Sequence, residues 1–180
     1  IRFYSSVLPN LYKFVLKQSQ VFATEALNEH QRTLRMRGRP KIVLARSYEE
    51  AMHLYNRYQN NVLGVITDAR YPREGIVDPM AGIKLMAEIR KHDPFVPLIL
   101  QSAEVDNRKY ISQYEASFVD KNSKKMDVDL RDIVSDNFGF GDFVFRNPHT
   151  LEEVARVRNL KELQNIIFHI PTESFLYHVQ

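Results

Sequence analysis

The first 40 residues carry hydrophobic positions at helical spacing, with charged residues between them. The apolar stripe consists of Leu8, Leu11, Val15, Phe22, Ala26 and Leu34. Pro9 falls where a first helical turn tolerates proline, and Gly38 and Pro40 are typical of a helix end. We therefore predict one long helix over residues 5–36. At ~1.5 Å per residue it is longer than one side of a compact domain, so we expect part of its stripe to be buried against a second copy of the chain or against the C-terminal appendage.

After Pro40 the pattern changes to short apolar runs that alternate with amphipathic segments. The predicted strands are Lys41–Ala45, Val62–Thr67, Pro97–Gln101 and Ser117–Asp120. The predicted helices run from a cap at Ser47 to Tyr58, over Ala81–Lys91, near Val105–Tyr114 and over Val128–Asn137. Unbroken apolar strands separated by helices predict an α/β fold with a doubly wound parallel sheet, covered on both faces. Ligands of such sheets bind at the carboxyl ends of the strands.

From residue 138 the composition shifts, beginning with the glycine-rich aromatic joint Phe138-Gly139-Phe140-Gly141. The segments expected after it are two hairpin strands, Asp142–Arg146 and Glu152–Val157, a helix over Leu160–Phe168 and a further helix capped by Thr172. We predict a main domain over residues 1–137 and a small α+β appendage over residues 138–180.

Composition narrows the classes of function. The 180 residues include no cysteine, which excludes disulfides, thiolate chemistry and cysteine zinc sites and fits a cytoplasmic protein. No apolar run approaches the ~20 residues of a membrane span. The six histidines lack metal-ligand spacing. A basic run, from Arg32 to Lys41, has no interleaved aromatic residues, which favours a solvated helix end or a protein-partner surface over a nucleic-acid site.

Three polar residues lie at or just beyond the ends of successive predicted strands: Asp68, Ser102 and Lys121. Because carboxyl ends of parallel strands meet at one edge, we expect the three side chains to converge to hydrogen-bonding or one-water distance. Each residue also has an ordinary interpretation. Asp68 would be a turn or capping aspartate, Ser102 a helix N-cap, and Lys121 a surface lysine.

Motifs around these residues occur in a characteristic order. They are Asp68-Ala-Arg-Tyr-Pro72, Gly82-Ile-Lys-Leu, Ser102-Ala103, and Phe118 followed by Lys121. In this order they resemble the receiver domains of bacterial response regulators, over residues 1–137. The resemblance implies a flavodoxin-like sheet in which Asp68 accepts a phosphoryl group from a histidine kinase or another phosphodonor. It also implies that Ser102 and Lys121 contact the phosphoryl oxygens and that Asp68 shares a Mg²⁺ ion with further acidic residues.

The chain departs from the receiver pattern in three ways. The acidic pair that follows the first strand of such domains has no counterpart, and Ile1-Arg-Phe-Tyr-Ser resembles the entry to the first helix. We therefore expect the first central strand and the acidic pair to precede Ile1, and Mg²⁺ to bind the intact protein rather than this chain alone. Asn122 stands where these domains have proline, and residues 73–80 are an insertion.

The extended first helix and the FGFGDFVFR segment resemble the receiver-like region of bacterial proteins that carry a pyruvate phosphate dikinase or phosphoenolpyruvate synthase-type portion. This resemblance implies a phosphotransferase parent that the segment regulates, and no enzyme activity in the segment itself. Two alternatives stay open. One is a degenerate receiver that is never phosphorylated and acts as a dimerisation or protein-interaction module. The other, weaker one is a nucleic-acid binder that uses the basic run.

Overall fold

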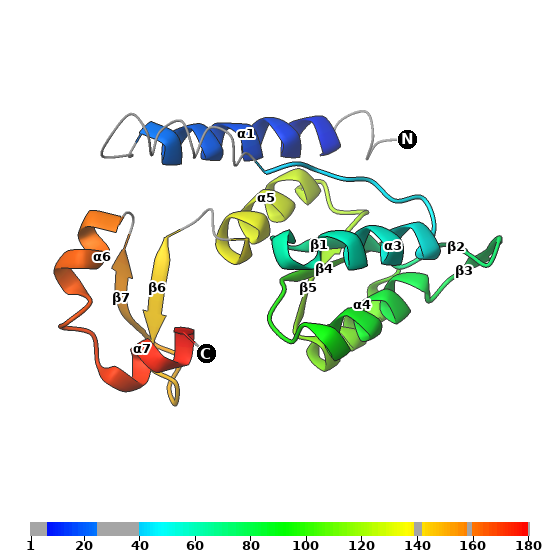
Figure 1. The fold of residues 1–180 in the computed structure, drawn as a ribbon. Helices are drawn as coiled ribbons and strands as arrows, with labels where there is room; N and C mark the ends of the chain where they lie inside the picture. The colour runs from blue at the N-terminus through cyan, green and yellow to red at the C-terminus, as the bar shows by residue number, and fades with distance from the viewer. Residues whose placement is uncertain (1–6, 25–39, 139–141, 158–159, 180) are drawn as a thin grey trace. The chain divides into compact units, whose positions relative to one another are not determined.

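The computed structural model describes residues 7–24, 40–138, 142–157 and 160–179 (Figure 1). The chain divides into two compact units, residues 1–133 and 134–180. The predicted boundary at residue 137 lies at the end of the helix in which this division falls. Each unit is described by itself below.

A three-stranded parallel sheet forms the centre of the first unit. Its strands are β1 (Val65–Asp68), β4 (Leu98–Ser102) and β5 (Ala116–Asp120), in the order β1-β4-β5. Three predicted strands thus form within a few residues of their expected bounds, and the α/β class with a parallel sheet is confirmed. Because the strands are parallel, the residues that follow them gather at one edge of the sheet.

Helices α3 (Tyr48–Tyr58) and α4 (Ala81–His92) supply the core on one face of this sheet. The buried members of that core include Tyr55, Met86, Ile89, Leu98 and Leu100, with Phe118 packed against them. Side chains alternate along a strand, so the intervening Ile99, Gln101 and Val119 belong to the opposite face, and they are buried as well. The sheet is therefore enclosed at its centre on both sides.

The start of α3 follows its sequence signals. The Ser47 hydroxyl accepts a hydrogen bond from the Glu50 amide at 3.2 Å. The Glu50 carboxylate in turn accepts one from the Arg46 amide at 2.7 Å. This reciprocal arrangement satisfies amides that the first turn leaves without intrahelical partners, and it confirms the predicted cap at Ser47.

The prediction of a buried strand over Lys41–Ala45 was wrong. The segment has no regular secondary structure, and Val43 and Leu44 are 56% and 46% exposed. In the described part of the chain, the strand at this side of the sheet is β1, which pairs with β4. An apolar run becomes a buried strand only when a neighbouring strand satisfies its amides and carbonyls, and no such pairing forms here.

A hairpin occupies the segment that the sequence showed only as an insertion. Strands β2 (Tyr71–Arg73) and β3 (Ile76–Asp78) pair in antiparallel fashion around Glu74 and Gly75, whose φ angles are 54° and 77°. Positive φ at both central residues is the backbone of a tight hairpin turn. The Glu74 amide donates to the Glu49 carboxylate at 2.8 Å, so the hairpin is attached to α3.

Three 3-10 helices and two α-helices also lie wholly or partly in the first unit. The helix predicted near Val105–Tyr114 is a pair of short 3-10 helices, η3 (Val105–Tyr110) and η4 (Ser112–Tyr114), and a third, η2 (Gln59–Asn61), follows α3. Helix α5 runs over Met126–Asn137. Helix α1 covers Leu8–Thr24, whereas residues 5–6 and 25–36 of the predicted long helix lie outside the described residues.

The apolar stripe of α1 is buried at Leu11 and Val15, and Val7, just before the helix, is buried as well. The Asn10 amide group donates to the Asp127 carboxylate of α5 at 3.3 Å. The proposed dimer contact through this helix stays a prediction. The basic run from Arg32 to Arg39 lies outside the described residues, while Lys41 is exposed.

The second unit has the predicted hairpin and helices. Strands β6 (Phe143–Arg146) and β7 (Glu153–Val157) pair in antiparallel fashion, and α6 (Leu160–Ile166) and α7 (Thr172–Val179) follow. Its core contains Phe145, Val157 and Ile170, and the Phe145 ring stacks on Phe175 with centroids 6.3 Å apart. None of the helices in the described ranges is both long and apolar enough to cross a membrane.

Candidate functional site

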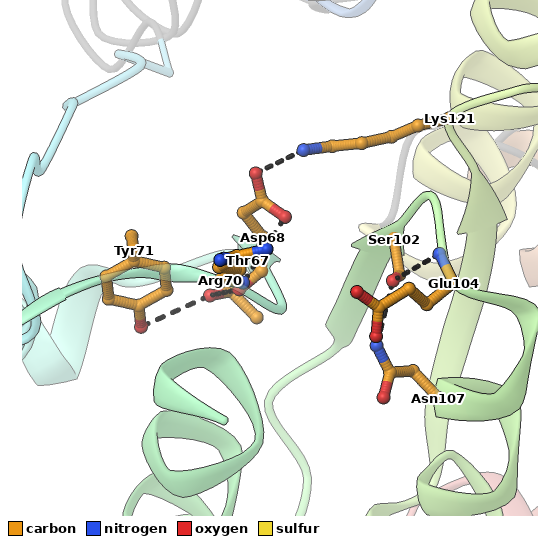
Figure 2. A network of polar contacts seen from close by, with 8 residues as sticks. All are labelled: Thr67, Asp68, Arg70, Tyr71, Ser102, Glu104, Asn107 and Lys121. Carbon is orange, nitrogen blue, oxygen red and sulfur yellow. Dashed lines mark hydrogen bonds and ion pairs between the residues drawn. The ribbon is translucent and has the colours of Figure 1, made fainter. Parts of the chain in front are cut away.

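An ion pair joins the carboxyl ends of the two outer strands of the parallel sheet. Asp68 ends β1, Lys121 follows β5, and the Lys121 ammonium donates to Asp68 Oδ2 (Figure 2). The two side chains are 40% and 29% exposed, so both the carboxylate and the ammonium reach solvent. Since β4 lies between their strands, the pair spans the carboxyl edge of the sheet.

Strand register explains why these two side chains meet. Asp68 pairs with Gln101, and Gln101 pairs with Val119, so the three residues share one face. Lys121 comes two residues after Val119, and its amide donates to the Ser102 carbonyl at 2.9 Å, which continues the ladder past the end of β5. The lysine therefore leaves the backbone on the same face as the aspartate.

Ser102 does not join this pair. It directly follows Gln101, so its side chain leaves β4 on the other face. Its hydroxyl, 3% exposed, accepts hydrogen bonds from the Glu104 amide at 3.0 Å and the Asn107 side-chain amide at 2.9 Å (Figure 2). Among the described residues Ser102 therefore shares no hydrogen bond with Asp68 or Lys121, and its convergence with them to one-water distance stays a prediction. Both donors lie within five residues of Ser102, so the serine stabilises the turn that leads into η3. This role is close to the helix N-cap that its ordinary interpretation predicted.

Helix α4 begins directly against the backbone of the aspartate. The Gly82 amide donates to the Ala69 carbonyl at 3.1 Å. A Cβ atom on residue 82 would stand 2.0 Å from the Asp68 carbonyl oxygen. Glycine is thus a steric requirement of this approach, which gives a physical reason for the glycine in the motif that follows Asp68.

Tyr71 contributes to the site, and sequence analysis did not single it out. Its hydroxyl is 3.4 Å from that of Thr67, which donates to the Asp68 carbonyl at 3.1 Å. Burial raises the pKa of Tyr71 to about 12, so the phenol stays protonated at neutral pH. The signal in the sequence was an aromatic residue three positions after the aspartate and next to Pro72.

Asn122 has a structural role that accounts for the departure from proline. Its side-chain amide donates to the Ala103 carbonyl at 2.8 Å, and its backbone amide donates to Asp120 Oδ1 at 2.8 Å. Proline has no amide for the second of these bonds. The first contact connects the turns after β4 and β5, the second is local to the end of β5, and both hold the backbone next to Lys121.

The expected Mg²⁺ ion finds few ligands in these residues. In the part of the chain that the structure describes, no group of three or more histidine, aspartate or glutamate side chains is arranged to hold a metal ion. Asp68 supplies one carboxylate, whereas Mg²⁺ requires six oxygen ligands in near-octahedral geometry. Asp68 by itself therefore offers too few oxygen ligands to hold Mg²⁺.

The chain has no significant match in comparisons with protein-family models, with curated proteins or with solved structures. The Asp68–Lys121 pair is the contact that points most clearly to a site, because it joins residues 53 positions apart in the chain.

Proposed function

We propose that the first unit is a receiver-type regulatory domain in which Asp68 is the phosphoacceptor. The observation that carries this proposal is the partly exposed Asp68–Lys121 pair at the carboxyl edge of a parallel sheet. Such an edge is where ligands of these sheets bind. The proposal includes a doubly wound, flavodoxin-like fold, which is supported by the parallel strand order and by buried residues on both faces of the sheet.

The chemistry needs a nucleophile and a cation. An Asp68 carboxylate oxygen attacks the phosphorus of a phosphodonor, and the new O–P bond forms as the donor's bond to phosphorus breaks. The leaving group departs with that electron pair and takes a proton from solvent. The product is an acyl phosphate with more negative charge than the carboxylate, and the neighbouring Lys121 ammonium compensates that charge through charge-assisted hydrogen bonds.

The second candidate is an interaction module that is never phosphorylated. One observation favours it: the Ser102 hydroxyl is already engaged by Glu104 and Asn107 and is buried, so it shares no hydrogen bond with Asp68 or Lys121 in the described structure. In that case Asp68 and Lys121 would form a structural ion pair, and partner binding would depend on other surfaces.

Labelling separates the two candidates. The full-length natural protein, incubated with Mg²⁺ and a small phosphodonor such as ³²P-labelled acetyl phosphate, should acquire an alkali-labile label. The label should be absent in Asp68→Asn and retained in Asp106→Asn, a matched change at an exposed aspartate of η3. If wild-type protein stays unlabelled by both this donor and a phosphohistidine donor, the phosphoacceptor proposal fails and the interaction module is favoured.

A further inference from the structure

Gln101 is a polar side chain in an apolar place. It lies on the central strand of the sheet and is 3% exposed. Its neighbours on the same face, Ile99 and Val119, are fully buried aliphatic residues. Burying a carboxamide among aliphatic side chains costs free energy of folding unless its donors and its acceptor form hydrogen bonds.

The amide nitrogen of Gln101 lacks such a partner. Among the described residues, Nε2 of Gln101 and Oδ1 of Asp127 are the buried side-chain polar atoms without a hydrogen bond. Only the glutamine atom is a donor. An unsatisfied buried donor destabilises the fold, so an apolar residue of equal size would suit the present state of the domain better.

The position of Gln101 relative to Asp68 suggests what the amide is for. The two residues are register partners in adjacent strands and share a face, which Lys121 also shares. The backbone is linked as well, because the Ala69 amide donates to the Gln101 carbonyl at 3.0 Å. A glutamine side chain is one methylene longer than an aspartate, so its amide can reach the level of a group attached to the Asp68 carboxylate.

The present contacts of Asp68 leave room for this donor. Oδ2 accepts from Lys121, and among the described residues Oδ1 accepts a single hydrogen bond, from the Arg70 amide at a long 3.4 Å. A phosphoryl group on the carboxylate would add three acceptor oxygens beside the glutamine. The Gln101 amide is a neutral donor that would stabilise the negative charge of this phosphoryl group. The Lys121 ammonium would remain the cation beside Asp68.

We infer that Gln101 is a positioning residue for phosphorylated Asp68: its carboxamide donates to an oxygen of the acyl phosphate and thereby favours the phosphorylated state. This inference rests on the proposed function. It goes beyond it by assigning a role to a buried residue that no motif singled out, and by predicting that the donor is unsatisfied until phosphorylation occurs.

The test compares three variants of the full-length protein. Gln101→Met removes both amide donors at nearly equal length, and Gln101→Glu keeps the shape but replaces the donor by an acceptor. Ser174→Ala is the control, since it removes a buried polar group from the second unit, outside the proposed site. The readouts are the melting temperature without phosphodonor, the labelled fraction at equilibrium with ³²P-labelled acetyl phosphate, and the half-life of the label after the donor is removed.

Gln101→Met should melt at or above the wild-type temperature, because it removes an unsatisfied donor. Its labelled fraction or label half-life should fall about tenfold, the size of one lost hydrogen bond to a charged group. Gln101→Glu should lower labelling further, whereas Ser174→Ala should keep the wild-type labelled fraction and label half-life. Wild-type labelling in Gln101→Met would overturn the inference and leave the proposed function intact. A melting temperature well below wild type would overturn it too, since the amide would then be bonded, for example to a buried water, before phosphorylation. An unlabelled wild-type protein would instead refute the proposed function itself.

Discussion

The two ends of the parallel sheet are held in different ways. At the amino ends of β4 and β5, the Arg90 guanidinium contacts four backbone carbonyls. Its Nε donates to Tyr114 at 2.8 Å, Nη1 to Val96 and Asp93 at 2.7 and 3.2 Å, and Nη2 to Glu115 at 3.3 Å. At the carboxyl ends, the corresponding connection is the side-chain pair of Asp68 and Lys121.

The amino end of the sheet is therefore held by fixed structural contacts, whereas the contact at its carboxyl end can change partners. Backbone carbonyls neither titrate nor react, so the contacts of Arg90 have one arrangement. Burial lowers the pKa of Arg90, but a guanidinium stays charged at any physiological pH. Asp68 and Lys121 are partly exposed side chains that can exchange each other for water or for a ligand. The comparison therefore predicts large stability effects at the amino end and functional effects at the carboxyl end.

The largest effect should come from Arg90→Met. Methionine fills part of the space but donates no hydrogen bonds, so up to four carbonyls lose a charged donor. We expect the free energy of unfolding, measured by urea denaturation, to fall by about 3–4 kcal/mol. Arg57→Met is the control, because Arg57 is exposed and its recorded contact is with the adjacent Tyr58 ring. Equal losses in the two variants would contradict the structural role of Arg90.

Gly82→Ala should have the next largest effect. Its Cβ would stand 2.0 Å from the Asp68 carbonyl oxygen, a backbone atom that moves only if α4 shifts. We expect a loss of about 2–3 kcal/mol in unfolding free energy, together with a lower labelled fraction. Gly75→Ala, which meets open space but has a φ of +77°, should cost only about 1 kcal/mol and leave labelling unchanged. A larger stability loss in Gly75→Ala than in Gly82→Ala would contradict the close approach of α4 to the Asp68 backbone.

Tyr71 predicts a pH dependence at the carboxyl end. Its pKa is about 12 in the folded protein against a usual value of 10.0, so the unfolded chain loses the proton first as pH rises. The stabilising contribution is complete below pH 10 and is lost as the pH rises from 10 through 12, by about 1–2 kcal/mol. Unfolding free energies measured across this range should decline less in Tyr71→Phe. They should decline as in wild type in Tyr12→Phe, a change at an exposed tyrosine.

The smallest effect on stability should come from Lys121→Met. A partly exposed ion pair contributes at most about 1 kcal/mol, since Asp68 can be hydrated when the ammonium is removed. Labelling, in contrast, should fall about tenfold, because the acyl phosphate loses its cation. Lys84→Met is the matched control: its ammonium is 2.6 Å from Asp78, so stability should change similarly while labelling is kept. A large loss of stability in Lys121→Met alone would favour a purely structural pair.

Much of the architecture follows from local patterns. The Ser47 cap, the apolar face of α4 and the runs Pro97–Gln101 and Ser117–Asp120 were enough to predict α3, α4, β4 and β5, because capping and periodicity act over a few residues. The hairpin β2–β3 was missed, although Gly75 within the insertion was a usable turn signal. Lys41–Ala45 was misassigned because its composition is that of a strand and the absence of a pairing partner cannot be read locally.

Some features of the candidate site were likewise predictable from the sequence, and others were not. The sequence by itself determined which polar residues end the strands, and therefore that Asp68 and Lys121 lie at one edge of the sheet. Only the tertiary structure decided that Ser102 turns away and that Gln101 shares the face of the aspartate with an unpaired donor. The reason is physical. Strand ends are specified by the local run of residues, whereas the face on which a terminal side chain emerges depends on the register between strands far apart in the chain.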